Sequence, residues 1–162
     1  MKNLSPYQSK VKGFTLIELL VVIGILAVLL AIVLIAINPA RQFSQANNTK
    51  RRSDVNALLN AVHQYMVDNR GTSPAGIDTT VKDVTSTAGA TNIDLCAPLV
   101  TRYMADMPTD PQTGTRSYTT GDCTQVGATY GTGYTITRSA ADNRITVAAP
   151  GAELGDNISV TR

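Results

Sequence analysis

Residues 10–37 read KVKGFTLIELLVVIGILAVLLAIVLIAI, and this stretch decides the architecture of the chain. From Phe14 to Ile37 it holds 24 residues with a single charged side chain, Glu18. At 1.5 Å per residue, a helix of this length spans about 36 Å, enough to cross a hydrocarbon core of about 30 Å. A secretory signal peptide has a shorter apolar region that ends at a small-residue cleavage site, and neither feature fits here. We therefore predict a single membrane-spanning helix over residues 14–37.

The remainder of the chain is polar, and its composition excludes several classes of protein. The 162 residues are 43% hydrophobic and only 16% charged, whereas soluble domains carry about 25% charged residues. A freely soluble cytosolic enzyme is a poor fit, and the sequence holds no phosphate loop, nucleophile elbow or Cys/His zinc pattern. Residues 53–162 carry seven basic and eleven acidic side chains, which argues against a nucleic-acid-binding surface there. We expect a protein that is not an enzyme.

The residues around the start of the apolar run resemble the N-terminal signature of type IV prepilins and pseudopilins. The matching features are a basic leader, then Gly13, Phe14 and Glu18 at a fixed spacing before an unbroken apolar helix. In that family a membrane aspartyl peptidase cuts after the glycine and methylates the new N-terminus. The resemblance therefore implies a leader of residues 1–13, cleavage between Gly13 and Phe14, and N-methylation of Phe14.

The resemblance also implies an orientation in the membrane. Three lysines precede the apolar run and four basic residues follow it within 15 positions, so the positive-inside rule does not decide the topology. In the family, the leader stays in the cytoplasm and the remainder of the chain lies outside. The same orientation is expected here.

Glu18 stands where the family has its membrane glutamate. A carboxylate in a bilayer costs about 2.5–3.5 kcal/mol on insertion scales, so it needs a partner or a route to the interface. After cleavage, Phe14 would carry a free α-amine about one helical turn away, and each neighbouring subunit would offer another. A pair with a neighbour's amine would offset the cost of burial on assembly and set the axial stagger of subunits. Snorkelling of Glu18 to the headgroups is the alternative, and the adjacent leader motif favours the assembly role.

The helical pattern continues beyond Ile37 into a one-sided stem over residues 38–70. Pro39 removes a backbone hydrogen bond, so we expect either a kink near residues 35–38 or a new helix that begins at Pro39. The stem's apolar residues follow helical spacing: Val55, Leu58, Leu59, Val62, Tyr65 and Met66. Gly71 follows as a left-handed cap. Because an amphipathic helix must bury its apolar stripe, we expect the stem to pack on the C-terminal part of the chain.

Residues 71–162 are predicted to form an external head of short elements. Residues 71–92 are rich in Gly, Ser and Thr and indicate a loop, and residues 95–104 indicate a short helix. Strands are predicted at residues 117–120, 130–138, 144–148 and 158–161. A small antiparallel sheet packed on the stem gives an α+β fold. This arrangement resembles the pilin head, and residues 103–111 are similar to the turn that precedes the sheet in pseudopilins.

The head also contains two sets of residues that form candidate sites. Cys96 and Cys123 are the only cysteines, and an external location permits a disulfide between them, with two buried thiols as the alternative. Many pilins similarly link the head near its C-terminus by a disulfide. Asp106, Asp110 and Asp122 are candidate calcium ligands, because Ca²⁺ prefers oxygen and some pseudopilins bind it in this region. Their spacing is not diagnostic, and we expect no other metal or cofactor.

The leading hypothesis is a structural subunit of a type IV pilus-like filament. Its partners would be further copies of the chain, prepilin peptidase, the pilus or secretion assembly machinery, and membrane lipid before assembly. The protein would begin as a single-pass prepilin in the cytoplasmic membrane and end in an extracellular filament. A minor pilin, or a pseudopilin of type II secretion or competence, is the alternative within this class. A membrane-anchored binding protein that never polymerises is the alternative outside it. Arg41 and the basic run 50–52 do not indicate nucleic acid, since solvent, lipid headgroups or subunit pairing account for them.

Overall fold

The computed structural model describes residues 13–118 and 121–162, and the chain divides into two compact units. The first unit extends to Pro39 and the second begins at Ala40. Residues 1–12, which hold the leader's three lysines, lie outside the described residues. Helix α1 (Leu16–Ile37) forms the first unit, and Thr15 is its N-cap. None of its residues is buried.

The helical pattern is interrupted at a single residue between α1 and α2 (Pro39–Asp68). Asn38 adopts a left-handed backbone conformation with φ of 46°, and Pro39 is the first residue of α2. Proline is suited to this position because the first helical N–H has no intrahelical partner. Both expectations for Pro39 are therefore met in part, since the pattern breaks at Asn38 and a new helix begins at Pro39. At the other end, the N–H of Gly71 donates to the carbonyl of Met66 (2.7 Å), and Gly71 has φ of 84°.

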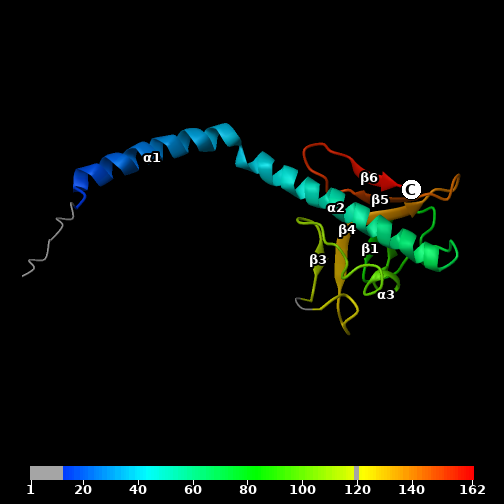
Figure 1. Cartoon of the computed structure of the whole chain (residues 1–162). Coiled ribbons are helices and arrows are strands. Elements are labelled where there is room, and N and C mark those ends of the chain that lie inside the picture. The colour runs from blue at the N-terminus through cyan, green and yellow to red at the C-terminus, as the bar shows by residue number, and fades with distance from the viewer. Residues whose placement is uncertain (1–12, 119–120) are drawn as a thin grey trace, which may run out of the picture. The chain divides into compact units, whose positions relative to one another are not determined.

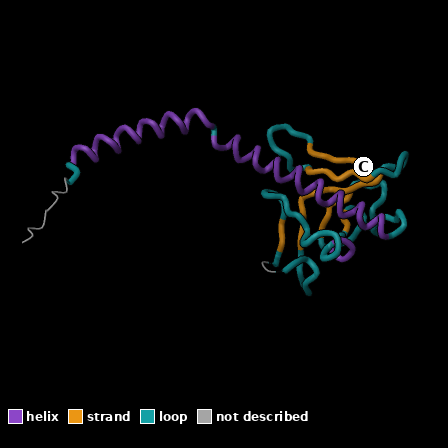
Figure 2. The backbone as a smooth tube through the Cα atoms, viewed as in Figure 1, coloured by secondary structure: helices purple, strands orange, loops and turns teal. Residues whose placement is uncertain are grey.

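The second unit contains nearly all of α2 and a mixed sheet that packs against this helix (Figures 1 and 2). The strand order is β2-β1-β4-β5-β6, and β3 pairs separately with β4. The elements after α2 are β1 (Lys82–Thr85), β2 (Asn92–Ile93), α3 (Cys96–Leu99), β3 (Thr115–Arg116), β4 (Tyr130–Arg138), β5 (Ile145–Ala149) and β6 (Ile158–Thr161). All pairs are antiparallel except β1 with β2, which is parallel. The sheet is therefore mixed rather than purely antiparallel, while the α+β class is confirmed.

The apolar stripe of α2 is buried in one core with the inner face of the sheet. Residues of β4 alternate between buried and half-buried, and the register places Ile136 opposite Val147 of β5. This period of two is what a sheet covered on one face requires. The fully buried core residues include Val55, Leu58, Leu59 and Val62 of α2 with Val84, Tyr134 and Val147 of the sheet. The head thus buries the stem's apolar stripe, as an amphipathic helix demands.

Three of the sequence-based boundaries in the head are wrong. Residues 71–92, expected to be loop, contain β1, whose single strongly apolar buried residue, Val84, gives little alternation to detect. The helix expected over 95–104 is only Cys96–Leu99, because Val100 is extended and Thr101 has φ of 69°. The strand expected at 117–120 lies instead at Thr115–Arg116, where the chain pairs with Gly131 and Tyr130. Thr119 and Thr120 lie outside the described residues. β4 and β6 begin and end as predicted.

Candidate functional site

The N-terminus of α1 is capped by reciprocal hydrogen bonds between Thr15 and Glu18. The Thr15 hydroxyl accepts from the backbone N–H of Glu18 at 3.3 Å. In return, the Glu18 carboxylate accepts from the Thr15 backbone N–H at 2.8 Å and from the Thr15 hydroxyl at 2.7 Å. This arrangement is a capping box, which satisfies N–H groups that have no partner inside the helix. It also fixes the direction of the carboxylate, which turns back toward Thr15 at the start of the helix.

The surface of α1 is apolar all round and uncovered. Its large side chains are roughly half to four-fifths exposed, and Glu18 is the only charged residue along its length. Among the described helices, α1 is the one that is long and apolar enough to cross a membrane. A helix with an apolar surface on every side requires lipid or protein around it. The uncovered helix and its carboxylate at one end form the first part of the candidate site.

Comparison with known protein families finds a match for the N-terminal part of the chain. Residues 8–34 match the prokaryotic N-terminal methylation motif, which is the leader signature of type IV pilins and pseudopilins. The chain carries a pilin-type leader. The match includes Gly13, Phe14 and Glu18, and it supports a precursor of the pilin or pseudopilin type. The comparisons with curated proteins and with solved structures found no match.

In the head that follows this pilin-type leader, the two cysteines are joined. Cys96 and Cys123 form a disulfide that closes a loop with a sequence separation of 27. A loop of this length corresponds to roughly 3–4 kcal/mol of stabilisation in the chain-entropy model. The bonded cysteines thus exclude the alternative of two buried free thiols.

The three candidate calcium ligands are not brought together. Asp106 accepts from the Tyr118 hydroxyl and pairs with Arg116, whereas Asp122 accepts from Thr124. Asp110 is buried elsewhere and has a different set of partners. Among the described residues, no group of three His, Cys, Asp or Glu side chains is placed to hold a metal ion. The carboxylates instead fix loops of the head.

A buried ion network centred on Arg51 ties the head to α2, and the sequence analysis did not identify it. Arg51 is fully buried, and its Nε donates to Asp110 Oδ2 at 2.6 Å while Nη2 donates to Oδ1 at 3.2 Å. The third contact runs from Nη1 to Glu153 Oε2 at 2.8 Å. Two-point pairing with a carboxylate suits the planar guanidinium group. One side chain thereby joins α2 to the loop before β3 and to the loop before β6.

The carboxylates of this network are held ionised by their donors. Burial opposes ionisation of Asp110, but hydrogen bonds from Arg51 and from the backbone N–H groups of Thr113 and Gln112 outweigh it and lower its pKa to about 2. Arg51, with Asn47 and Ser44, likewise lowers the pKa of Glu153 to about 2. The hydrogen bonds with Asp110 in turn raise the pKa of Arg51. The network is therefore fully charged at neutral pH.

A sequence signal for this network does exist. Arg51 lies four residues before Val55 and seven before Leu58, so it falls on the apolar stripe of α2. An arginine at such a position must be paired if it is buried. The basic run 50–52 was expected to face solvent, lipid headgroups or other subunits, whereas Lys50 and Arg52 are exposed and Arg51 is buried.

Proposed function

We propose that the chain is the precursor of a structural subunit of a type IV pilus-like filament. In this proposal a prepilin peptidase removes the leader after Gly13 and methylates the new N-terminus at Phe14. The processed subunit is held in the cytoplasmic membrane by α1, with the head outside. Assembly then transfers α1 from lipid into a filament built from further copies of the chain.

The observation that carries the proposal is the position of the Glu18 carboxylate at the capped N-terminal end of an uncovered apolar helix. In the capping box the carboxylate lies against the Thr15 backbone N–H, one residue from the predicted cleavage point. Cleavage would create an α-amine at Phe14, so the charge that Glu18 needs appears at the same end of the helix. Burial of the carboxylate without such a partner would be costly.

Neighbouring copies supply the second half of the argument. A subunit's own α-amine and that of its neighbour would compete for one carboxylate, and a pair between Glu18 of one subunit and the α-amine of its neighbour would set the axial offset between the two. The apolar surface of α1 would be covered by other copies of α1, because lipid is absent from the filament. In this proposal, the Glu18 carboxylate gains its partner on processing, and the apolar surface of α1 is covered by protein on assembly.

Mass analysis of the mature protein tests the processing step. We expect purified subunits to begin at Phe14 with one methyl group on the α-amine. Replacement of Gly13 by a bulky residue should leave an unprocessed precursor in the membrane, whereas Gly24→Ala, a change at the other glycine of the first unit, should be processed normally. A mature N-terminus beyond Ile37, or an uncut chain in the filament fraction, would contradict the proposal.

A further inference from the structure

Phe43 is an exposed aromatic side chain near the start of α2. It is 71% exposed, whereas the apolar stripe of α2 from Val55 to Val62 is buried in the head. The other large apolar side chains that are exposed in the described part of the second unit are all aliphatic: Val67, Val81, Val126 and Leu154. A single exposed apolar residue is ordinary on a protein surface. The position of Phe43 along the chain is what gives it a candidate partner.

The chain keeps Phe43 close to the end of the membrane-spanning candidate α1. With 22 residues, α1 is about 33 Å long, so Ile37 lies near the edge of a hydrocarbon core of about 30 Å when α1 spans it. Phe43 follows Pro39 by four residues, so it lies within about 13 Å of Ile37 whatever the angle between the two helices. The headgroup layer adds about 5–8 Å on each side of the core. Phe43 is therefore within reach of the membrane interface.

The residues that follow Phe43 attach this part of α2 to the head. The Ser44 hydroxyl donates to Glu153 Oε1 at 2.8 Å, and the Asn47 side-chain amide donates to Glu153 Oε2 at 2.9 Å. Arg51 donates to the same carboxylate at 2.8 Å. Because α2 is continuous from Pro39, these bonds fix Phe43 relative to the head. A Phe43 ring held in the membrane interface would therefore hold the head at the bilayer surface.

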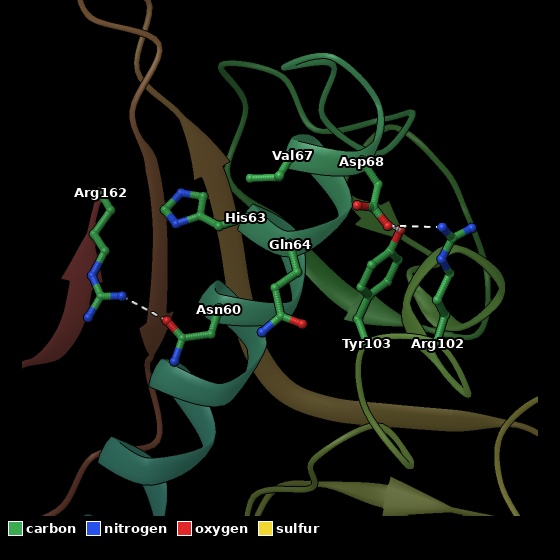
Figure 3. Close-up of a pocket in the computed structure, with 8 residues that line it drawn as sticks. All are labelled: Asn60, His63, Gln64, Val67, Asp68, Arg102, Tyr103 and Arg162. Atoms are coloured by element: carbon green, nitrogen blue, oxygen red, sulfur yellow. Dashed lines mark hydrogen bonds and ion pairs between the residues drawn. The ribbon is translucent and has the colours of Figure 1, made fainter.

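The charge beside Phe43 also suits a lipid surface. Arg41 is an exposed cation two residues earlier, and a long arginine side chain can reach lipid phosphates while its aliphatic part stays in less polar surroundings. Helices that lie in membrane interfaces combine Phe, Trp or Leu with basic residues in this way. The far end of α2 differs: Val67 lies 24 residues, or about 36 Å, farther along. Figure 3 shows that the hollow beside it is lined mostly by polar and charged side chains.

We propose that Phe43 anchors the start of α2 in the membrane interface, with its ring among the lipids of the leaflet that faces the head. This anchor rests on the proposed function, because it belongs to the subunit that α1 holds in the membrane before assembly. It adds a second contact with lipid, which keeps the head at the bilayer surface and is lost when α1 leaves the membrane. A second copy of the chain is the other candidate occupant of the Phe43 surface, and the experiment separates the two.

Tryptophan fluorescence of the full chain in vesicles tests the anchor. The sequence contains no Trp, so a single introduced Trp reports only its own surroundings. The vesicles are phosphatidylcholine with phosphatidylglycerol, at a high ratio of lipid to protein. We expect Phe43→Trp to emit at shorter wavelength than Val67→Trp, to be quenched several-fold less by acrylamide, and to be quenched by lipids brominated near the headgroup. Val67→Trp is the matched control, because Val67 is 80% exposed on the same helix, and brominated lipids should not quench it.

Leu26→Trp, in the middle of α1, separates failure of the anchor from failure of the proposed function. Lipids brominated near the bilayer centre should quench it. If they do and Phe43→Trp is as open to acrylamide as Val67→Trp, the anchor is overturned and the membrane-held subunit stands. Protection of Phe43→Trp that appears only at high protein density would place a second copy there, which also overturns the anchor. If Leu26→Trp is not quenched, the membrane-held subunit fails, and the anchor fails with it.

Discussion

The two helices of this chain bear opposite relations to their surroundings. α1 has apolar side chains on every face and buries none of them within the chain. α2 has a single apolar stripe, which is buried against the head from Val55 to Val62, and its one buried cation, Arg51, pairs with Asp110 and Glu153. The second helix is packed within the head, whereas the first is long and apolar enough to cross a membrane and has no buried residue. Substitutions in α2 should therefore change the stability of the head, whereas substitutions in α1 should change the yield of filaments.

The largest effect on the stability of the head is expected from Arg51. Arg51→Met would leave the Asp110 carboxylate buried without its cation, which costs about 3–5 kcal/mol. Denaturant unfolding of the full chain in detergent measures this loss. The double variant Arg51→Met/Asp110→Asn removes both charges and keeps an acceptor for the backbone N–H groups of Gln112 and Thr113. It should be more stable than Arg51→Met alone, and equal losses in the two variants would show that the ion pair is not the cause.

A leucine-to-alanine substitution should have clearly different effects on the stability of the head in the two helices. Leu58 of α2 is fully buried, whereas Leu29 of α1 is 53% exposed. Leu58→Ala should lower the free energy of unfolding of the head by about 2–5 kcal/mol through lost burial and a cavity. Leu29→Ala should change it by less than about 0.5 kcal/mol. Comparable losses from both variants would mean that α1 is part of the head's folding unit.

Acid should lower the stability of the second unit over a defined range of pH. The pKa values of Asp110 and Glu153 fall to about 2 in the folded chain, from ordinary values of 3.8 and 4.5. Groups with lowered folded pKa values stabilise the fold above their ordinary pKa, and that contribution is lost as the pH falls through the folded value. The melting temperature should therefore be flat down to about pH 4.5 and then fall toward about pH 2. Glu153→Gln should flatten part of this decline, and an unchanged pH profile would contradict the assignment.

The sequence predicted the elements whose patterns are long and self-contained. The apolar run predicted α1, the 3.6-residue stripe predicted α2, and the strands predicted at residues 130–138 and 158–161 have the bounds of β4 and β6. β1 was missed because Val84 is the main apolar residue that it contributes to the core, and its strand conformation depends on its pairing with β4. The short α3 ends early because of the turn at Thr101, a tertiary feature that local propensity does not encode.

The residues of the candidate site also fall into two groups, those that a local sequence motif predicts and those that only the fold brings together. Gly13, Phe14 and Glu18 lie close together in the sequence, so a local motif is enough to predict roles for them, and those roles stay predictions. The capping bonds of Glu18 were not foreseen, although Thr15 three residues before Glu18 has the spacing of a capping box. The partners of Arg51 lie 59 and 102 residues farther along the chain, and only the fold brings them together.

Glu18→Ala in a filament-shearing assay tests the central claim most directly, namely that α1 obtains its missing partners from other copies. The variant lacks the carboxylate that is costly in lipid, so it should be processed and remain in the membrane at wild-type levels. A neighbour's buried amine would then be unpaired, and the sheared filament fraction should hold about tenfold less subunit than the wild type. Glu18→Asp should be intermediate, because it keeps the charge and shortens its reach. Wild-type filament yield from Glu18→Ala, with no wild-type subunits present, would contradict the account.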